Sequence, residues 1–431
     1  MPRGAAGPAR NGDRPGNPLP QAAGPAARTA AGGASVPGPG GHTRSRRAAG
    51  ALVTRAGARV SGPGTGGGPR RSGGTPLLRW RLRPPAGPRP KEPYADGEPP
   101  LPYPAGWFLL VPSHDVRPGA VVTRRLMDED VVVYRTRGGR ARVIRPHCPH
   151  LGAHLGCGGR VDGESIVCPF HHFAFGGDGA VTRTGPGYAP GAVRDRLAVL
   201  PCHEVNGGIF TWAGGAPGQP PGWRLPELLD PSGPPLRFAR TEVLSHPQEL
   251  CENVADLGHL RALHGFSDAV PKGGPVIDGH RFRATVELTR TFPPFGRLRA
   301  DLTFHLYGLS LLHATLRDAR SGLVFDVLAA SRPVAPWRVE LLIGTRVAVD
   351  GGHRVWSRLP PPLLRPLTGA AGWVNLLTVV RDMSRDLPVW DAKRYVSPPR
   401  LVRGDGPVGV FRAWARQFYP DPPADGGTPA G

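Results

Sequence analysis

Cysteine and long hydrophobic runs are both scarce in this sequence of 431 residues. Five cysteines, two of them in a metal-ligand pattern, do not make a disulfide framework and favour a reducing compartment. We expect a cytoplasmic protein, with peripheral membrane association as an alternative. No run reaches the roughly 18 uncharged apolar residues of a spanning helix. The nearest candidate, residues 366–380, contains Pro366, Gly369 and Asn375 and is expected to belong to a buried or substrate-lining helix.

Acidic residues are almost absent from the first 91 positions, which hold 16 Lys or Arg and the single acid Asp13. Gly, Pro, Ala and Arg dominate there, and such a segment cannot bury enough apolar surface to offset the entropy of ordering. We therefore expect residues 1–100 and 421–431 to be disordered, although an over-extended gene start would leave the same signature. Nucleic-acid binding is not expected, because nothing aromatic or repeated accompanies the charge.

Two short motifs each pair a cysteine with a histidine: Cys148 with His150 and, after a spacer of 17 residues, Cys168 with His171. Two thiolates and two imidazoles match a Rieske [2Fe–2S] centre, in which the cysteines hold one iron and the histidines the other. Zinc also accepts two cysteines and two histidines. Zinc ribbons, however, usually place two cysteines in one half of the site. Here each half supplies one cysteine and one histidine, which favours the iron–sulfur cluster.

A second group of metal-binding side chains follows at Asp256, His259 and His264. Asp256 and His259 lie one turn apart on an ideal helix and share a face. The two histidines are five residues apart, roughly 140° around a helix, and both reach one metal only if the helix bends or ends between them. Gly265 is a natural C-cap and favours such an ending. Two histidines and one carboxylate are the usual ligands of Fe(2+) in non-haem oxygenases, and the carboxylate is expected to come from elsewhere in the chain rather than from Asp256.

Three stretches resemble the Rieske domain of non-haem iron oxygenases: residues 147–155, 158–161 and 168–171. Residues 252–265 resemble the mononuclear iron motif of the same enzymes. Three further stretches resemble the end of the sterol-acting members, which are the cholesterol 7-desaturases and, as near relatives, the 3-ketosteroid 9α-hydroxylase oxygenase components: residues 393–398, 404–407 and 411–419.

The resemblance also implies roles for individual residues. The family's third iron ligand is an Asp four residues before a Trp, which selects Asp386; Asp382 is the alternative and Asp391 is the least favoured. Asp256 is implied to be a bridging carboxylate, placed between a Rieske histidine of one subunit and His259 of the next. That arrangement implies a head-to-tail homotrimer.

The sequence departs from known Rieske proteins at a few positions around the cluster. The high-potential proteins of respiratory complexes carry a disulfide where this chain has Ala153 and Phe170. The resemblance therefore implies a potential toward the low end of the Rieske range of about −150 to +300 mV, which suits electron donation to an oxygen-activating site. The common Arg after the first histidine is Leu151, and the common Gly-Trp or Gln-Trp after the last is His172-Phe173. These changes remove no cluster ligand, but they alter the residues that surround the ligands.

Short apolar runs separated by Gly, Pro and Asp turns predict an all-β Rieske domain over residues 101–220. After a Gly/Pro-rich linker, period-two alternation at residues 282–288 and 339–347 predicts half-buried antiparallel strands. We expect a long helix over residues 373–395. The predicted class is α+β, and the resemblance implies a helix-grip (START-like) catalytic domain with a mononuclear iron over residues 221–420.

The resemblance implies an oxidoreductase that uses O2 and electrons from NAD(P)H, supplied through a separate ferredoxin or flavin reductase. We expect Leu, Val, Phe and Trp to line its cavity, from segments such as 304–312 and 363–380, without the basic clamp that an aromatic acid would need. The predicted reaction is 7,8-desaturation of cholesterol or a close 3-hydroxysterol. Steroid hydroxylation of the 9α type is one alternative, and a non-enzymatic Rieske electron carrier with a lipid-binding domain is another.

Overall fold

The computed structural model describes seven stretches of the chain: residues 78–79, 101–215, 219–292, 296–318, 321–350, 352–354 and 356–420. The predicted disorder of residues 1–100 and 421–431 lies outside the described residues, apart from Leu78–Arg79. These two residues form strand β1, which pairs in parallel with Ala239 and Arg240. The structure departs from the prediction at these two residues.

Within the described residues, the part of the chain that carries the cysteine–histidine motifs forms three small antiparallel sheets. Their strand orders are β10-β5-β4-β3, β11-β12-β2 and β6-β7-β8-β9. The expectation of an all-β fold for this region is confirmed. The bounds are β2 (Gly106–Pro112), β3 (Val121–Leu126), β4 (Glu129–Arg135), β5 (Ala141–Ile144), β6 (Arg160–Asp162), β7 (Ser165–Val167), β8 (Ala174–Phe175), β9 (Val181–Arg183), β10 (Val199–Leu200), β11 (Cys202–Val205) and β12 (Gly208–Ala213), with the 3-10 helix η1 at Ser113–Asp115.

The apolar run in β4 explains how this region builds two cores. Successive side chains of a strand point to opposite faces. Val132 therefore packs in the core that contains Cys148 and Cys168, whereas Val131 and Val133 pack in the neighbouring core. Both faces of β4 are covered, which is why its sequence is continuously apolar rather than alternating. The cysteine loops thus rest directly on a packed sheet.

The second half of the described chain folds into a nine-stranded sheet, with the order β1-β13-β20-β19-β18-β17-β16-β14 and with β15 paired to β16. All pairs are antiparallel except β1 with β13. The alternating segments predicted as half-buried strands lie in β16 and β20. The bounds are β13 (Arg237–Val243), β14 (Asp268–Pro271), β15 (Val276–Asp278), β16 (Arg281–Phe292), β17 (Gly296–Tyr307), β18 (Leu311–Asp318), β19 (Leu323–Ala335) and β20 (Arg338–Val349).

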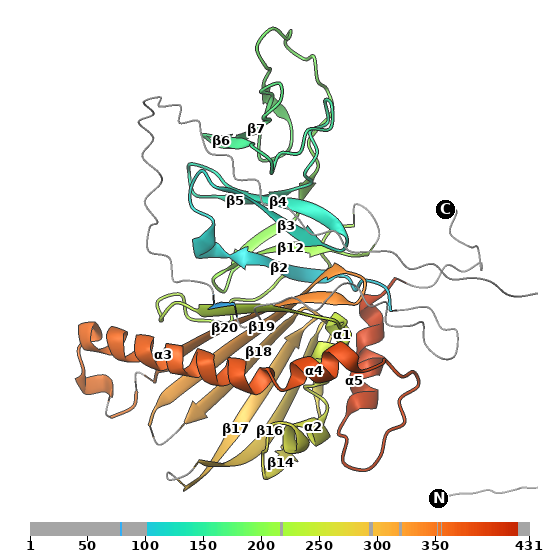
Figure 1. The fold of residues 1–431 in the computed structure, drawn as a ribbon. Coiled ribbons are helices and arrows are strands. Elements are labelled where there is room, and N and C mark those ends of the chain that lie inside the picture. The colour runs from blue at the N-terminus through green and yellow to red at the C-terminus, as the bar shows by residue number, and fades with distance from the viewer. Residues whose placement is uncertain are drawn as a thin grey trace, which may run out of the picture. The chain divides into compact units, whose positions relative to one another are not determined.

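Helices cover one face of this sheet, and Figure 1 shows α3 lying across the strands. A sheet with a long helix against it fits the predicted α+β class. The bounds are α1 (Pro247–Glu252), α2 (Leu257–Ala262), α3 (Pro361–Met383), α4 (Asp386–Ala392) and α5 (Val408–Ala415), with 3-10 helices η2 (Trp356–Arg358) and η3 (Arg416–Phe418).

The long helix predicted over residues 373–395 is wrong in its bounds. It begins earlier, as α3, and is interrupted at Ser384 and Arg385 before α4. Pro388 explains the interruption, because a proline lacks the N–H that would bond to the carbonyl of Ser384 and its ring clashes with that carbonyl. Pro388 instead occupies the first turn of α4, where N–H groups have no helical partner anyway.

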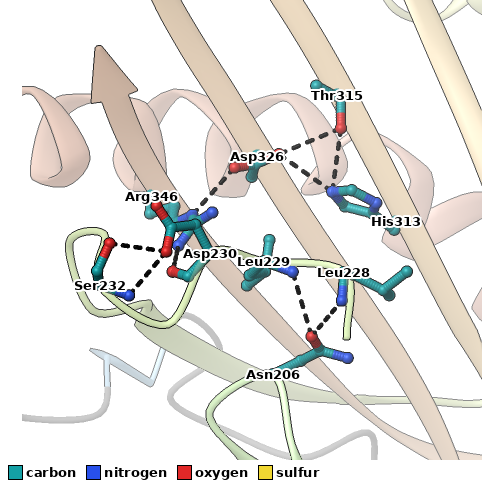
Figure 2. A network of polar contacts seen from close by, with 9 residues as sticks. All are labelled: Asn206, Leu228, Leu229, Asp230, Ser232, His313, Thr315, Asp326 and Arg346. Atoms are coloured by element: carbon teal, nitrogen blue, oxygen red, sulfur yellow. Dashed lines mark hydrogen bonds and ion pairs between the residues drawn. The ribbon is translucent and has the colours of Figure 1, made fainter. Parts of the chain in front are cut away.

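A polar network holds the connection between β12 and β13 against the sheet (Figure 2). Asn206 accepts a hydrogen bond from the main-chain N–H of Leu228, at 2.7 Å. Arg346 on β20 donates to Asp326 on β19 at 3.0 Å and to the main-chain oxygen of Asp230 at 2.8 Å. Strand alternation puts this network on the face of the sheet opposite the one that lines the cavity described below.

One segment, Pro362–Ala392, is long and apolar enough to cross a membrane when judged by length and composition alone. It comprises α3 and α4, and its inner side chains pack on β13 and β20. Arg365 and Arg381 interrupt it, so it does not form one long uncharged run in the sequence.

Candidate metal centres

The structure brings the four predicted cluster ligands together as two like pairs. Cys148 and Cys168 are 3% and 1% exposed, and their thiols interact. The rings of His150 and His171 are 4.8 Å apart between centroids and nearly perpendicular. The sulfur pair is therefore buried in the core, and the nitrogen pair lies on its outer side. This separation matches a two-iron cluster with thiolates on one iron and imidazoles on the other.

The loops that carry these residues are fixed by main-chain hydrogen bonds. The N–H of Cys148 donates to the carbonyl of Ala153, and the N–H of Cys168 donates to that of Phe173, both at 2.9 Å. Burial raises the pKa of Cys148 to about 11, although the N–H groups of His150 and Leu151 act in the opposite direction. N–H groups directed at sulfur stabilise a thiolate, as iron–sulfur sites require.

One buried ring nitrogen tests the fit to a cluster directly. Within the described residues, Nδ1 of His150 is shielded from solvent and has no hydrogen-bond partner. Such an atom is costly unless something binds it. A metal ligated by His150 and His171 would satisfy it, so the donor set fits a [2Fe–2S] group. The disulfide of high-potential Rieske proteins is absent, since all cysteines of the described chain are free.

The histidine end of this site has an apolar rim. The ring of His150 packs edge-on against Phe173 and Tyr188, at 5.0 and 5.4 Å between centroids. Leu151 and Phe170 beside the histidines are 65% and 60% exposed. Leu151 stands where an Arg is common, and Phe170 stands where high-potential Rieske proteins have a disulfide cysteine. Together the two side chains surround the histidines with apolar surface.

The second candidate centre begins at the N-terminus of α2. The carboxylate of Asp256 caps this helix by accepting a hydrogen bond from the main-chain N–H of His259, at 3.0 Å. The helix ends at Ala262, between the two histidines, as the sequence predicted. Gly265 then adopts a φ of +68°, in the left-handed region that glycine tolerates best. This ending turns His264 back toward His259.

The ligand atoms of His259, His264 and Asp386 all lie within 4.8 Å of one another. Nε2 of His264 is 3.3 Å from a carboxylate oxygen of Asp386, and the two histidine rings are 5.1 Å apart. Burial lowers the pKa of His259, outweighing the nearby hydrogen bond and carboxylates that raise it. A neutral imidazole is the form that binds a metal. Nδ1 of His264 is shielded and has no hydrogen-bond partner among the described residues.

The other candidate carboxylates are placed differently. Asp382 lines the adjacent cavity and lies 4.0 Å from Arg385, but it is not part of the three-residue group. Asp391 accepts a hydrogen bond from the main-chain N–H of Leu244 at 2.9 Å, which is a structural contact. The break between α3 and α4 puts Asp386 at the start of a helix and directs it toward the histidines.

A cavity of about 400 Å³ opens beside this centre, between the sheet and α3. Its lining residues in the described chain include no Lys or Arg, as the sequence predicted. The polar groups gather at the metal-binding end, with Asn375 and Thr378 as further polar side chains on α3. The apolar lining is Leu250, Val254, Leu260, Phe266, Leu288, Ala300, Leu302, Phe304, Leu312, Ala314, Leu316, Phe325, Val327, Ala329, Val379, Met383 and Trp390.

Three supporting residues were not assigned a role from the sequence. Asn253 donates a long hydrogen bond of 3.4 Å to Asp386. Arg385 donates to the main-chain oxygen of Leu263 at 3.2 Å, so it ties the break before α4 to the histidine loop. Nδ2 of Asn375 is shielded and has no partner in the described chain. Its position in an apolar helix was visible in the sequence, but the cavity it faces was not.

Comparison with known proteins agrees with this architecture. Residues 106–202 match the family described as the Rieske [2Fe–2S] domain, and residues 370–419 match the C-terminal domain of 3-ketosteroid 9α-hydroxylase. Dicamba monooxygenase bound to 3,6-dichlorosalicylic acid covers 73% of this chain and 96% of its own, with a TM-score of 0.53 and 16% identity. At that identity the likeness shows the fold alone. Fold and paired metal centres define a Rieske oxygenase, an oxidoreductase with a [2Fe–2S] cluster and a mononuclear iron.

Curated relatives narrow the family. Cholesterol 7-desaturase nvd of Xenopus laevis is 31% identical over 353 residues, which are 75% of this chain and 73% of the relative. The Bombyx mori enzyme of the same name is 30% identical, over 74% of this chain and 70% of the relative. The probable 3-ketosteroid-9-alpha-monooxygenase oxygenase component of Rhodococcus rhodochrous is 26% identical, over 75% and 82%. The chain belongs to the Rieske oxygenase family that contains these cholesterol 7-desaturases.

Proposed function

We propose that this protein desaturates a sterol, forming the 7,8 double bond of cholesterol or a close 3-hydroxysterol. The observation that carries the proposal is the apolar cavity, which ends at His259, His264 and Asp386 and has no basic side chain among its described lining residues. A rigid, uncharged ligand suits such a lining, whereas a carboxylic acid would need a cation. The cholesterol 7-desaturases among the relatives support the same substrate class.

The metal ligands are part of the proposal. Cys148, Cys168, His150 and His171 would hold the cluster within a domain of residues 101–220. His259, His264 and Asp386 would hold the Fe(2+) within a catalytic domain of residues 221–420, leaving open positions on the metal.

The overall reaction balances as one sterol, one O2, one NAD(P)H and one proton giving the dehydrosterol, two waters and NAD(P)+. The two metal groups, when bound, would supply one-electron transfer and O2 reduction. The residues of the chain would position the sterol, exclude water from the cavity and hold His259 in the neutral form. A separate reductase or ferredoxin would deliver the electrons, as the name of the Rhodococcus relative, an oxygenase component, suggests.

Asp256 would connect the two centres between subunits of a head-to-tail homotrimer. Its carboxylate sits at the N-terminus of α2 and, within the described residues, bonds only to the main chain of His259. The second carboxylate oxygen would accept a hydrogen bond from a Rieske histidine of the next subunit. A carboxylate there orients the imidazole and favours its protonated form.

Asn375 would bind the sterol's single polar group. It lines the same cavity as Asp386. Ring A would lie at Asn375 while ring B reaches the metal. A hydrogen bond to the 3-hydroxyl would satisfy the orphaned amide.

Iron content and turnover test the proposal together. The purified chain alone should contain about three irons, two from the cluster and one from the mononuclear site. When a ferredoxin–reductase pair, NADPH and cholesterol are added, mass spectrometry should show a product lighter by two hydrogens. Two irons per chain and no turnover would instead describe an electron carrier.

Steroid hydroxylation is the second candidate, and a specific observation favours it. Residues 370–419 match the C-terminal domain of 3-ketosteroid 9α-hydroxylase, and this stretch includes Asn375 and Asp386. Gain of one oxygen on a 3-ketosteroid, with cholesterol unchanged, would select the hydroxylase.

A further inference from the structure

Helix α3 is apolar on two opposite faces, and the described residues cover only one of them. The inner face packs on the sheet and buries Thr368, Gly372, Leu376 and Val380. The outer face carries four large aliphatic side chains that are at least half exposed: Leu363 (54%), Leu367 (53%), Val374 (65%) and Leu377 (54%). At 3.6 residues per turn these four fall within about 80° of one another, with Ala370 between them. We call these five residues the outer stripe.

A stripe of this kind is unusual on a water-exposed surface. Scattered exposed aliphatic residues are normal, but contiguous ones mark a contact with a partner or a membrane. A helix that is apolar all round is normally buried in a core or in lipid. A core does not account for α3, because only 22% of its most apolar window is buried within the described structure.

The charges around the outer stripe indicate what covers it. Residues 352–381 contain four arginines and no Asp or Glu. Two of these arginines are exposed and flank the stripe: Arg358 precedes it, and Arg381 follows one turn after Leu377 on the same face of the helix. Arginines at the ends of an apolar helix face can extend to lipid phosphates while the aliphatic residues enter the acyl boundary.

The N-terminal segment carries charge of the same sign as these arginines. The first 91 residues add 16 basic side chains against one acid. A second cationic copy, or this N-terminal segment, would meet the arginines with like charge. An anionic bilayer meets both with opposite charge, at about 1 kcal/mol per basic residue near the surface.

We propose that the outer stripe of α3 docks the protein on an anionic phospholipid bilayer, with the helix lying in the interface rather than crossing it. The C-terminal half of the same helix contributes Asn375 and Val379 to the cavity lining, and Thr378 is both exposed and part of that lining. Docking would therefore place the cavity next to the phase in which an apolar substrate dissolves. This last consequence, unlike the docking itself, rests on the proposed sterol substrate.

The test is sedimentation of the full-length holoprotein with vesicles of phosphatidylcholine containing phosphatidylserine. Binding is measured at 0.1 M and 0.5 M salt, because higher salt screens the basic N-terminal segment but not apolar insertion. The variant L367Q/V374Q/L377Q should bind at least about tenfold more weakly at 0.5 M salt. The control V270T/V276T/I277T removes three similarly exposed aliphatic residues from β14 and β15 and should bind like the wild type.

Three results would overturn the proposal: no sedimentation of the wild type with the vesicles at either salt concentration, equal binding by the stripe variant at 0.5 M salt, or a lipid-free oligomer whose mass falls in the stripe variant. The last result would identify the stripe as an interface between copies of the chain. Turnover of detergent-solubilised sterol is measured separately. Intact vesicle binding without any sterol turnover would reject the proposed function and leave the docking surface standing.

Discussion

The main-chain carbonyl of Asp256 lies 2.6 Å from Nδ1 of His259 and accepts its hydrogen bond, so Nε2 of that ring is left for the metal. The side chain of Asp256 is used differently, since it caps α2 through the main-chain N–H of His259. One residue therefore orients a metal ligand through its backbone and stabilises the helix through its carboxylate. Neither contact needs the second carboxylate oxygen.

Replacing Asp256 with Asn separates these roles. Asn is as good an N-cap as Asp, and the main-chain carbonyl is unchanged, so the fold and both metals should be kept. Turnover should fall at least about 100-fold, because the charge proposed to link two subunits is lost. The measurement is product formation at a fixed cluster and iron content. Full coupled activity in Asp256→Asn would contradict the bridging role.

The identity of the carboxylate ligand can be decided by iron content. Asp386→Ala should lower the iron from about three to about two per chain and leave the cluster's EPR signal intact. Asp382→Ala is the matched control, since it lines the same cavity from α3 and should keep all three irons. Asp391→Ala should also keep them and should lower only stability, by about 1 kcal/mol, through the lost bond to Leu244. Iron loss in the Asp382 variant alone would reverse the assignment.

The cluster ligands are tested by changing the ligand type. His171→Cys should convert the Rieske EPR signal to one of ferredoxin type and lower the potential toward about −400 mV, because thiolates then surround more of the cluster. The mononuclear iron should stay bound. His172→Ala changes the neighbouring side chain and should preserve a Rieske signal; an unchanged signal in the His171 variant would show that His171 is not a ligand.

The polar network of Figure 2 predicts a pH-dependent stability. Burial pushes the pKa of Asp326 up, but the hydrogen bonds and charges of His313 and Arg346 outweigh it and hold the pKa below the ordinary value. The carboxylate therefore stabilises the fold at any pH above about 4, the unfolded value. This contribution is lost as the pH falls through the lower folded pKa.

Asp326→Asn should accordingly cost about 3 kcal/mol of unfolding free energy at pH 7, because Arg346 loses a buried partner. The difference from wild type should shrink below about pH 4. Denaturant unfolding across pH measures both. Asp230→Asn is the control, since its exposed side chain bonds only to nearby Ser232 and its change should have no measurable effect. A pH-independent difference would mean that the charge of Asp326 is not what stabilises the network.

The sequence was sufficient wherever the signal was local. The cysteine–histidine spacing predicted the pairs that the fold assembles, and Gly265 predicted the end of α2. The alternation in β16 and β20 predicted the sheet. The break at Ser384 was missed, because Pro388 disrupts the helix at a carbonyl four residues before its own position. The outer stripe of α3 was not foreseeable, since an apolar helix in sequence gives no sign of which faces the fold covers.

Replacing Asn375 with Leu should raise the stability of the free protein and weaken sterol binding. Nδ2 of Asn375 has no partner in the described chain, so the free protein bears the cost of a shielded, unsatisfied donor. Asn375→Leu removes that donor at similar volume and adds a better helix former. The variant should therefore be more stable by about 1 kcal/mol, which thermal or denaturant unfolding without substrate would detect.

The same change should weaken sterol binding. Losing one hydrogen bond to the 3-hydroxyl should raise KM about two- to tenfold, with kcat changed much less, because the group acts far from the reacting carbon. A cholestene that lacks the 3-hydroxyl separates this role from simple packing, since wild type and Asn375→Leu should then show the same KM. Thr378→Val is the matched control on the same helix, because its hydroxyl already donates to the carbonyl of Val374 at 2.9 Å. If Asn375→Leu is stabilised but turns over cholesterol with an unchanged KM, the orphaned amide has another purpose, and the 3-hydroxyl is bound elsewhere in the cavity.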